Sequence, residues 1–167
     1  MSSQLHKSNL AGPGDRNLVI SGAFRIHGSR YGVTFGRNRL GLSTFLEFFE
    51  AQGDNAETAF LHITPQGVEF PSASLRFHLD REFGVAAALM VAADRDGKEY
   101  SWMTSGKAGR DDIILVQDSS SPRDTRFPSE SFITIAELRE VITQWVFGDA
   151  LPPPAARWVA MPDVRWF

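Results

Sequence analysis

The chain has 167 residues, which is enough for one domain with a sizeable core and would be crowded for two. Hydrophobic residues make up 43% and charged residues 22%, and the absence of cysteine excludes disulfides, cysteine zinc sites and thiol nucleophiles. The sequence shows no run of about 18 apolar residues and no apolar signal-peptide core near its start. We therefore expect a cytoplasmic protein with no membrane contact.

Charge is distributed unevenly around the net value of −3. Residues 1–42 contain six basic residues and one acidic residue, so their net charge is +5, whereas residues 43–167 have a net charge of −8. A largely acidic surface disfavours nucleic acid and suits a basic protein partner.

Residues 1–16 are predicted to form a flexible leader, because they contain a Gly-Pro-Gly turn. A single domain, residues 17–167, is expected to follow. Strands are predicted at Leu18–Ile26 and Tyr31–Phe35. A helix is predicted over Thr44–Gln52, with an N-cap at Ser43 and a stop at Gly53, because apolar residues recur there at helical spacing: Leu42, Phe45, Leu46 and Phe49.

The middle of the chain favours strands, either alternating in polarity or continuously apolar. Asp94–Gly97 predicts a hairpin turn, because glycine adopts the positive φ that such turns need. Five strands are expected: Ala59–Ile63, Leu75–Asp80, Val85–Ala92, Glu99–Met103 and Ile113–Gln117.

After an exposed loop, a helix is predicted to begin near Thr134, which forms a capping box with Glu137. Gly148 should end this helix in a left-handed conformation, and Pro152–Pro154 cannot continue it. The predicted fold is therefore α+β: a single domain with a largely antiparallel sheet packed by about two helices.

No motif for catalysis is evident. The four histidines, at positions 6, 27, 62 and 78, do not have the spacing of a helical metal pair, and no serine-nucleophile or phosphate-loop motif occurs. We predict neither enzymatic activity nor a metal or other cofactor.

Acidic residues in the hairpin turn, at strand ends and in the loop after residue 117 are candidates for partner binding. If they gather at one end of the sheet, they would steer a basic partner; ordinary solvated turn residues are the alternative. Trp102 is a candidate interface anchor, although its type is equally common in cores and the core is the favoured place for it. The full candidate set is Asp94, Asp96, Glu99, Trp102, Asp111, Asp112, Asp118 and Asp124.

Two further hypotheses come from other residues. In the first, the protein is a small-molecule-binding or enzymatic α+β domain whose site is assembled from His62, Arg76 and His78. Arg30, Arg37 and Arg39 flank Tyr31 and Phe35. These residues could instead bind single-stranded nucleic acid by stacking and phosphate contact, as a weak nucleic-acid-binding module.

The end of the chain resembles a known family. Phe127-Pro128-Ser129, an amphipathic helix from Ile135 to Phe147, Gly148, a proline run and Trp158 follow in the order typical of a bacterial immunity-protein family, the first-numbered one of polymorphic toxin systems. The apolar strand, Asp-Gly turn and aromatic strand over residues 85–102 are similar to its central hairpin. The resemblance covers about residues 42–158; the tail after Trp158 extends beyond it.

This resemblance implies an immunity protein, or antitoxin, that binds and neutralises a cognate toxin domain by occluding its active site. Toxins paired with the family are often nucleic-acid deaminases and also nucleases. The implied partner is a protein, without direct binding of nucleic acid, and the implied role involves no catalysis.

Overall fold

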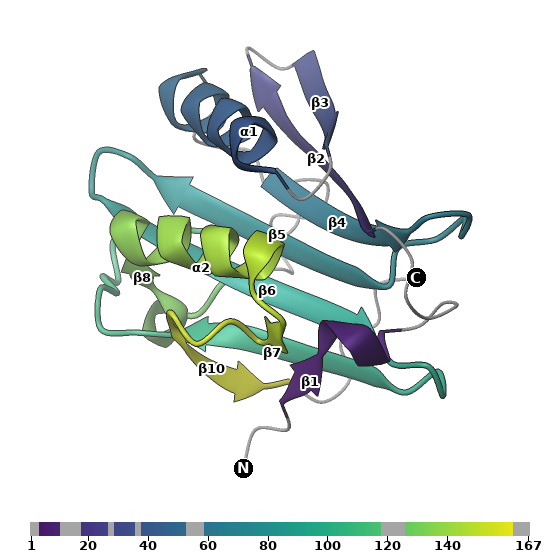
Figure 1. Cartoon of the computed structure of the whole chain (residues 1–167). Helices are drawn as coiled ribbons and strands as arrows, with labels where there is room; N and C mark the ends of the chain where they lie inside the picture. Colours follow the sequence, from purple (N-terminus) through teal and green to yellow (C-terminus); the bar gives the residue numbers. More distant parts are fainter. Residues whose placement is uncertain are drawn as a thin grey trace.

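The computed structural model describes residues 4–10, 18–26, 29–35, 38–52, 59–117 and 126–161. Its centre is an antiparallel sheet in the order β10-β7-β6-β5-β4-β2-β3, and β8 pairs with β6 off this path (Figure 1). The two helices lie on one face of this sheet (Figure 1). The prediction of a single α+β domain with a largely antiparallel sheet and two helices is confirmed.

The larger strands lie where hydrophobic alternation or continuous apolar sequence predicts them. The strands of the central sheet are β2 (Leu18–Ile26), β3 (Ser29–Phe35), β4 (Ala59–Pro65), β5 (Ala73–Asp80), β6 (Val85–Ala93), β7 (Glu99–Ser105), β8 (Ile133–Thr134) and β10 (Arg157–Ala160). A separate two-stranded pair joins β1 (Leu5–His6) to β9 (Ala150–Leu151). The helices are α1 (Arg39–Gln52) and α2 (Ile135–Phe147), with 3-10 turns η1 (Lys7–Asn9) and η2 (Ser129–Ser131).

The main core fills the space between the sheet and the helices. Phe45 of α1 packs edge-to-face against Phe24 of β2 and Phe77 of β5, with ring centroids 5.4 and 6.4 Å apart. On the α2 side, the core includes a fully buried Trp145 and the small side chains of alternate β6 residues, Ala86 among them. Alternation along β5 and β6 thus directs one row of side chains toward the helices.

The opposite face of β6 is also buried, which explains why this strand is apolar throughout. A second cluster joins its other row of side chains to one residue of β7 and to residues that follow this strand. Its members are Val85, Ala87 and Leu89 of β6, Met103 of β7, and Ile113, Leu115, Phe127 and Phe132. The segment 113–117 was predicted as a strand, but it forms only a single bridge, Val116 to Arg126. Its alternating burial comes from lying across the second face of the sheet.

Residues 4–10 correct the prediction of a flexible leader. Leu5 and Leu10 enter the main core, and the buried Lys7 ammonium donates to the carbonyls of Trp145 and Val146 at the end of α2. Lysine favours a helix C-terminus because the last carbonyls lack helical partners. The rest of the predicted leader, residues 1–3 and 11–16, lies outside the described residues.

Of the three predicted helix caps, one is confirmed and two are wrong. Thr134 and Glu137 form the predicted capping box. Helix α1 begins at Arg39, well before Ser43, because the Asn38 side chain accepts a hydrogen bond from the Gly41 N–H at 2.7 Å. Gly148 has an extended φ of −77° rather than a left-handed one.

Candidate protein-binding surfaces

The hairpin tip between β6 and β7 carries three predicted acidic residues. Asp94 is committed to the turn itself: its Oδ1 accepts hydrogen bonds from the N–H groups of Asp96 and Lys98, both at 2.9 Å. Its Oδ2 accepts from the Tyr100 hydroxyl at 3.0 Å. Only Asp96 and Glu99 therefore offer exposed carboxylates here, with Asp94 acting as a structural acceptor.

The pKa of Asp94 reflects this role. Desolvation alone would raise it, but hydrogen bonds from Lys98, Tyr100 and Asp96, together with the Lys98 charge, outweigh desolvation and hold the pKa below its ordinary value. The carboxylate is therefore fixed in its charged form by the groups of the turn.

The opposite end of the sheet carries a preformed arrangement of side chains. The Arg110 guanidinium lies 4.6 Å from the ring centroid of Phe83, in the turn between β5 and β6, and binds Asp112 through two hydrogen bonds of 2.8 and 3.0 Å. These bonds lower the pKa of Asp112, against a smaller effect of desolvation. Phe83 is 42% exposed, and Ile114, two residues after Asp112 in the chain, is 56% exposed.

We define the turn-end surface as Phe83, Arg110, Asp111, Asp112 and Ile114. Aromatic side chains and arginine are enriched at protein interfaces, and an exposed aliphatic side chain adds apolar area to such a surface. Phe83 and Ile114 were not predicted as binding residues from the sequence. The available signal was a phenylalanine inside the otherwise polar turn Arg81–Gly84.

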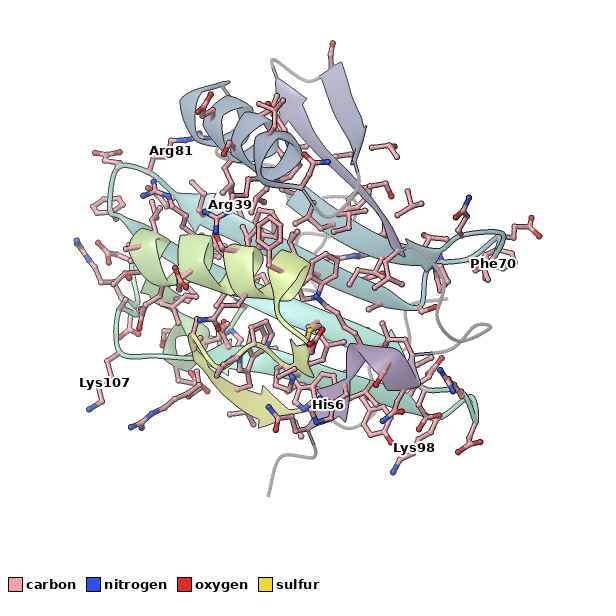
Figure 2. All side chains as sticks on the ribbon, in the orientation of Figure 1. His6, Arg39, Phe70, Arg81, Lys98 and Lys107 are labelled. Carbon is pink, nitrogen blue, oxygen red and sulfur yellow. The ribbon has the colours of Figure 1, made fainter. Side chains whose placement is uncertain are left out.

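The predicted acidic patch does not form as one surface. Asp94, Asp96 and Glu99 lie at the start of β7, whereas Asp111 and Asp112 follow its far end, about 20 Å away by the rise of a seven-residue strand. Figure 2 shows the same separation, with Lys98 at one end of the sheet and Lys107 at the other. Asp118 and Asp124 lie outside the described residues.

Trp102 is not available at the free surface, which corrects its place in the candidate set. Its side chain is 1% exposed and belongs to the main core, where it stacks on Tyr100 with ring centroids 5.7 Å apart. It points inward because Trp102 pairs with Met90 in the interior of the sheet, on the face that the helices cover.

The residues of the small-molecule hypothesis share one face of the sheet. His62, Arg76 and His78 alternate with the core-facing residues of β4 and β5, so all three lie on the face away from the helices. His62 Nδ1 is 2.6 Å from the Ser74 hydroxyl. His78 is 4% exposed, and its Nδ1 accepts a hydrogen bond from the Val116 N–H at 2.8 Å.

The described residues give little support to other classes of site. Within the described parts of the chain, no three histidine or carboxylate side chains are grouped as metal ligands. The same parts contain no helix with the length and hydropathy needed to cross a membrane. Of the arginine and aromatic residues in the nucleic-acid hypothesis, Arg39 begins α1 and is exposed, while Arg37 lies outside the described residues.

No protein-family model and no curated protein matches the chain. Among solved structures, the chain is similar to a crystal structure of a hypothetical protein from Neisseria gonorrhoeae. The TM-score is 0.49 at 12% identity, over 83% of this chain and 91% of the other.

Proposed function

We propose that the protein is an immunity protein that binds and neutralises a cognate bacterial toxin domain in the cytoplasm, without catalysis of its own. The observation that carries the proposal is the turn-end surface, where the exposed Phe83 ring lies against Arg110 and Ile114 is exposed two residues after Asp112. The C-terminal resemblance supplies the class of partner, a nucleic-acid deaminase or nuclease. Occlusion of the toxin's active site is the proposed mode of action.

The turn-end surface is suited to tight binding because part of its geometry is set before the partner arrives. Arg110 is held from one side by the Phe83 ring and from the other by both Asp112 oxygens. A side chain that is already ordered loses less conformational entropy on binding than a free one. Arg110 and Phe83 therefore form the proposed anchor, and the exposed Ile114 is proposed to extend it.

Electrostatics has a smaller role than the sequence alone suggests. Arg110 offsets the charge of Asp112, and the hairpin tip carries Arg95 and Lys98 among its carboxylates. Asp111 remains as an exposed carboxylate next to the anchor. It is placed to speed association with a basic cleft, because rim charges act mainly on association rates.

The decisive experiment is co-expression with the cognate toxin domain, which the proposal predicts at the C-terminus of a secreted protein encoded by a neighbouring gene. Wild-type protein should restore growth and co-purify with that domain. Phe83→Ala and Ile114→Ala should each weaken the complex roughly tenfold or more, the loss typical of a hot-spot side chain. Binding is measured by titration calorimetry with the purified toxin domain.

Phe70→Ala is the matched control. Phe70 is 68% exposed, more than Phe83, but lies in the connection between β4 and β5, at the end of the sheet where Lys98 also lies (Figure 2). Its loss should leave affinity unchanged. Equal weakening by the control would remove the turn-end surface from the proposal. Failure of the wild-type protein to rescue growth or to co-purify would contradict the immunity function and favour a ligand site at His62 and Arg76.

A further inference from the structure

Strand β10 forms one edge of the central sheet, and its outer side has no pairing strand among the described residues. It pairs on its inner side with β7, in the register Arg157 to Ser105 and Ala160 to Trp102. An unpaired strand edge presents rows of N–H and C=O groups that can accept another strand.

The register identifies which backbone groups point outward. The Met161 N–H donates to the Ser101 carbonyl at 2.9 Å, which makes these two residues a hydrogen-bonded pair. Hydrogen-bonded and non-hydrogen-bonded pairs alternate along an antiparallel ladder, so Val159 also bonds inward while Trp158 and Ala160 direct their backbone groups away from β7. In the described chain, no hydrogen bond uses the outward backbone groups of these two residues.

Next to this edge is an open groove of about 670 Å³, where the end of β7, the start of α2 and the turn before β10 meet. Lys107 and Arg157 contribute two exposed cations to its lining. Glu137 is the acidic residue of the lining, and its carboxylate is engaged by the Thr134 N–H at 2.7 Å. The groove is therefore positively charged in a protein that is acidic as a whole.

We propose that the β10 edge binds an extended acidic segment of a partner protein as an added strand. The backbone groups of Trp158 and Ala160 would pair with the segment, and Lys107 and Arg157 would bind its carboxylates at the groove. Backbone pairing supplies affinity for any extended chain, and the two cations select for acidic sequence. This site is independent of the proposed toxin binding.

A second copy of this chain fits the edge less well than an acidic segment. Residues 157–160 read Arg-Trp-Val-Ala, so a second β10 would add a cation and no carboxylate opposite the groove. Like charges brought together oppose association.

The test uses fluorescein-labelled peptides with blocked ends, EVTVE and its basic counterpart KVTVK, titrated with the full chain and followed by fluorescence anisotropy. We expect EVTVE to bind with a dissociation constant on the order of 0.1–1 mM, as befits a few backbone bonds, and KVTVK to bind at least about tenfold more weakly. Amide resonances of Trp158 and Ala160 should shift in NMR spectra on addition of EVTVE. No binding of EVTVE, or equal binding of both peptides, overturns the proposal.

Two variants locate the site. Ala160→Pro removes an outward N–H while leaving the ladder to β7 intact, and should weaken EVTVE binding about tenfold; Ala160→Val keeps the N–H and should bind normally. Lys107→Glu combined with Arg157→Glu should abolish the preference for EVTVE, whereas Lys98→Glu at the other end should not. Unchanged binding by Ala160→Pro overturns the proposal. Self-association of the wild-type chain that Ala160→Pro abolishes would assign the edge to a second copy instead.

Discussion

Asp94 and Asp112 had the same predicted role, but their carboxylates have different hydrogen-bond partners in the structure. Both were expected to face a partner. Asp94 instead accepts three hydrogen bonds inside its own turn, and Asp112 is held by Arg110. Residue type and turn context indicate that these carboxylates lie near the surface. Which hydrogen bonds their oxygens accept depends on groups that the fold brings close to them.

The lowered pKa of Asp94 gives a pH-dependent stability. Because its folded-state pKa lies below its unfolded value, its contribution is fully present above the ordinary aspartate pKa of about 3.9 and is lost as pH falls through the folded value. Asp94→Ala should therefore lower the urea midpoint at pH 7, and its difference from wild type should shrink below about pH 4. Asp96→Ala, at an exposed position in the same turn, is the control. A difference that stays constant from pH 7 to pH 3 would contradict this role.

At the scale of elements, periodicity predicts the long strands well. The limits of β2 are as expected, and β6 differs by one residue, because their apolar patterns are continuous over a whole strand. The short strands β1, β8, β9 and β10 were not predicted, since two to four residues carry no readable period. Residues 113–117 show the opposite error: strand-like alternation arises there from tertiary contact alone.

Alanine substitution should have opposite effects on stability at two glycines in the neighbouring strands β2 and β3. A Cβ on Gly22 would lie 2.5 Å from Leu61 Cδ2 and 2.9 Å from Phe45 Cε2, inside the main core. A Cβ on Gly32 would meet its nearest neighbour, the Gly22 carbonyl oxygen, at an ordinary 3.8 Å. Gly22→Ala should cost about 1–3 kcal/mol by overpacking. Gly32→Ala should be neutral or stabilise by up to about 1 kcal/mol, because glycine weakens a strand.

The measurement for this pair is urea unfolding of both variants beside wild type. Both substitutions add the same methyl group to neighbouring strands, one inside the core and one at an exposed position, so each controls for the other. Equal destabilisation by both substitutions would show that the packing of α1 over Gly22 is wrong.

At the scale of the whole molecule, recognition groups lie at separate places on one rigid sheet. The hairpin tip and the turn-end surface occupy opposite ends, and β10 forms one edge. Fold class and the C-terminal helix could be predicted from sequence because local patterns specify them. The division of the acidic residues between two ends could not, because it depends on the direction in which each strand crosses the sheet.

The segment at residues 4–10 predicts a large effect of N-terminal truncation. Deleting residues 1–10 removes Leu5 and Leu10 from the core, at about 1.5–3 kcal/mol each, and takes Lys7 from the end of α2. The free energy of unfolding should fall by about 3–6 kcal/mol in urea titrations. Ser8→Ala, at an exposed position of the same segment, should change it by less than about 0.5 kcal/mol. A truncated protein as stable as wild type would restore the flexible-leader interpretation.

The pairing of β1 with β9 also affects the order in which segments fold during synthesis. Lys7 donates to the carbonyls of Trp145 and Val146, which leave the ribosome long after Lys7 does. Chains are made from the N-terminus at about 5–20 residues per second, so residues 4–10 lack this partner until α2 has been made. These residues therefore reach their native place later than segments whose partners are close in sequence, and the core closes only after the final helix has emerged.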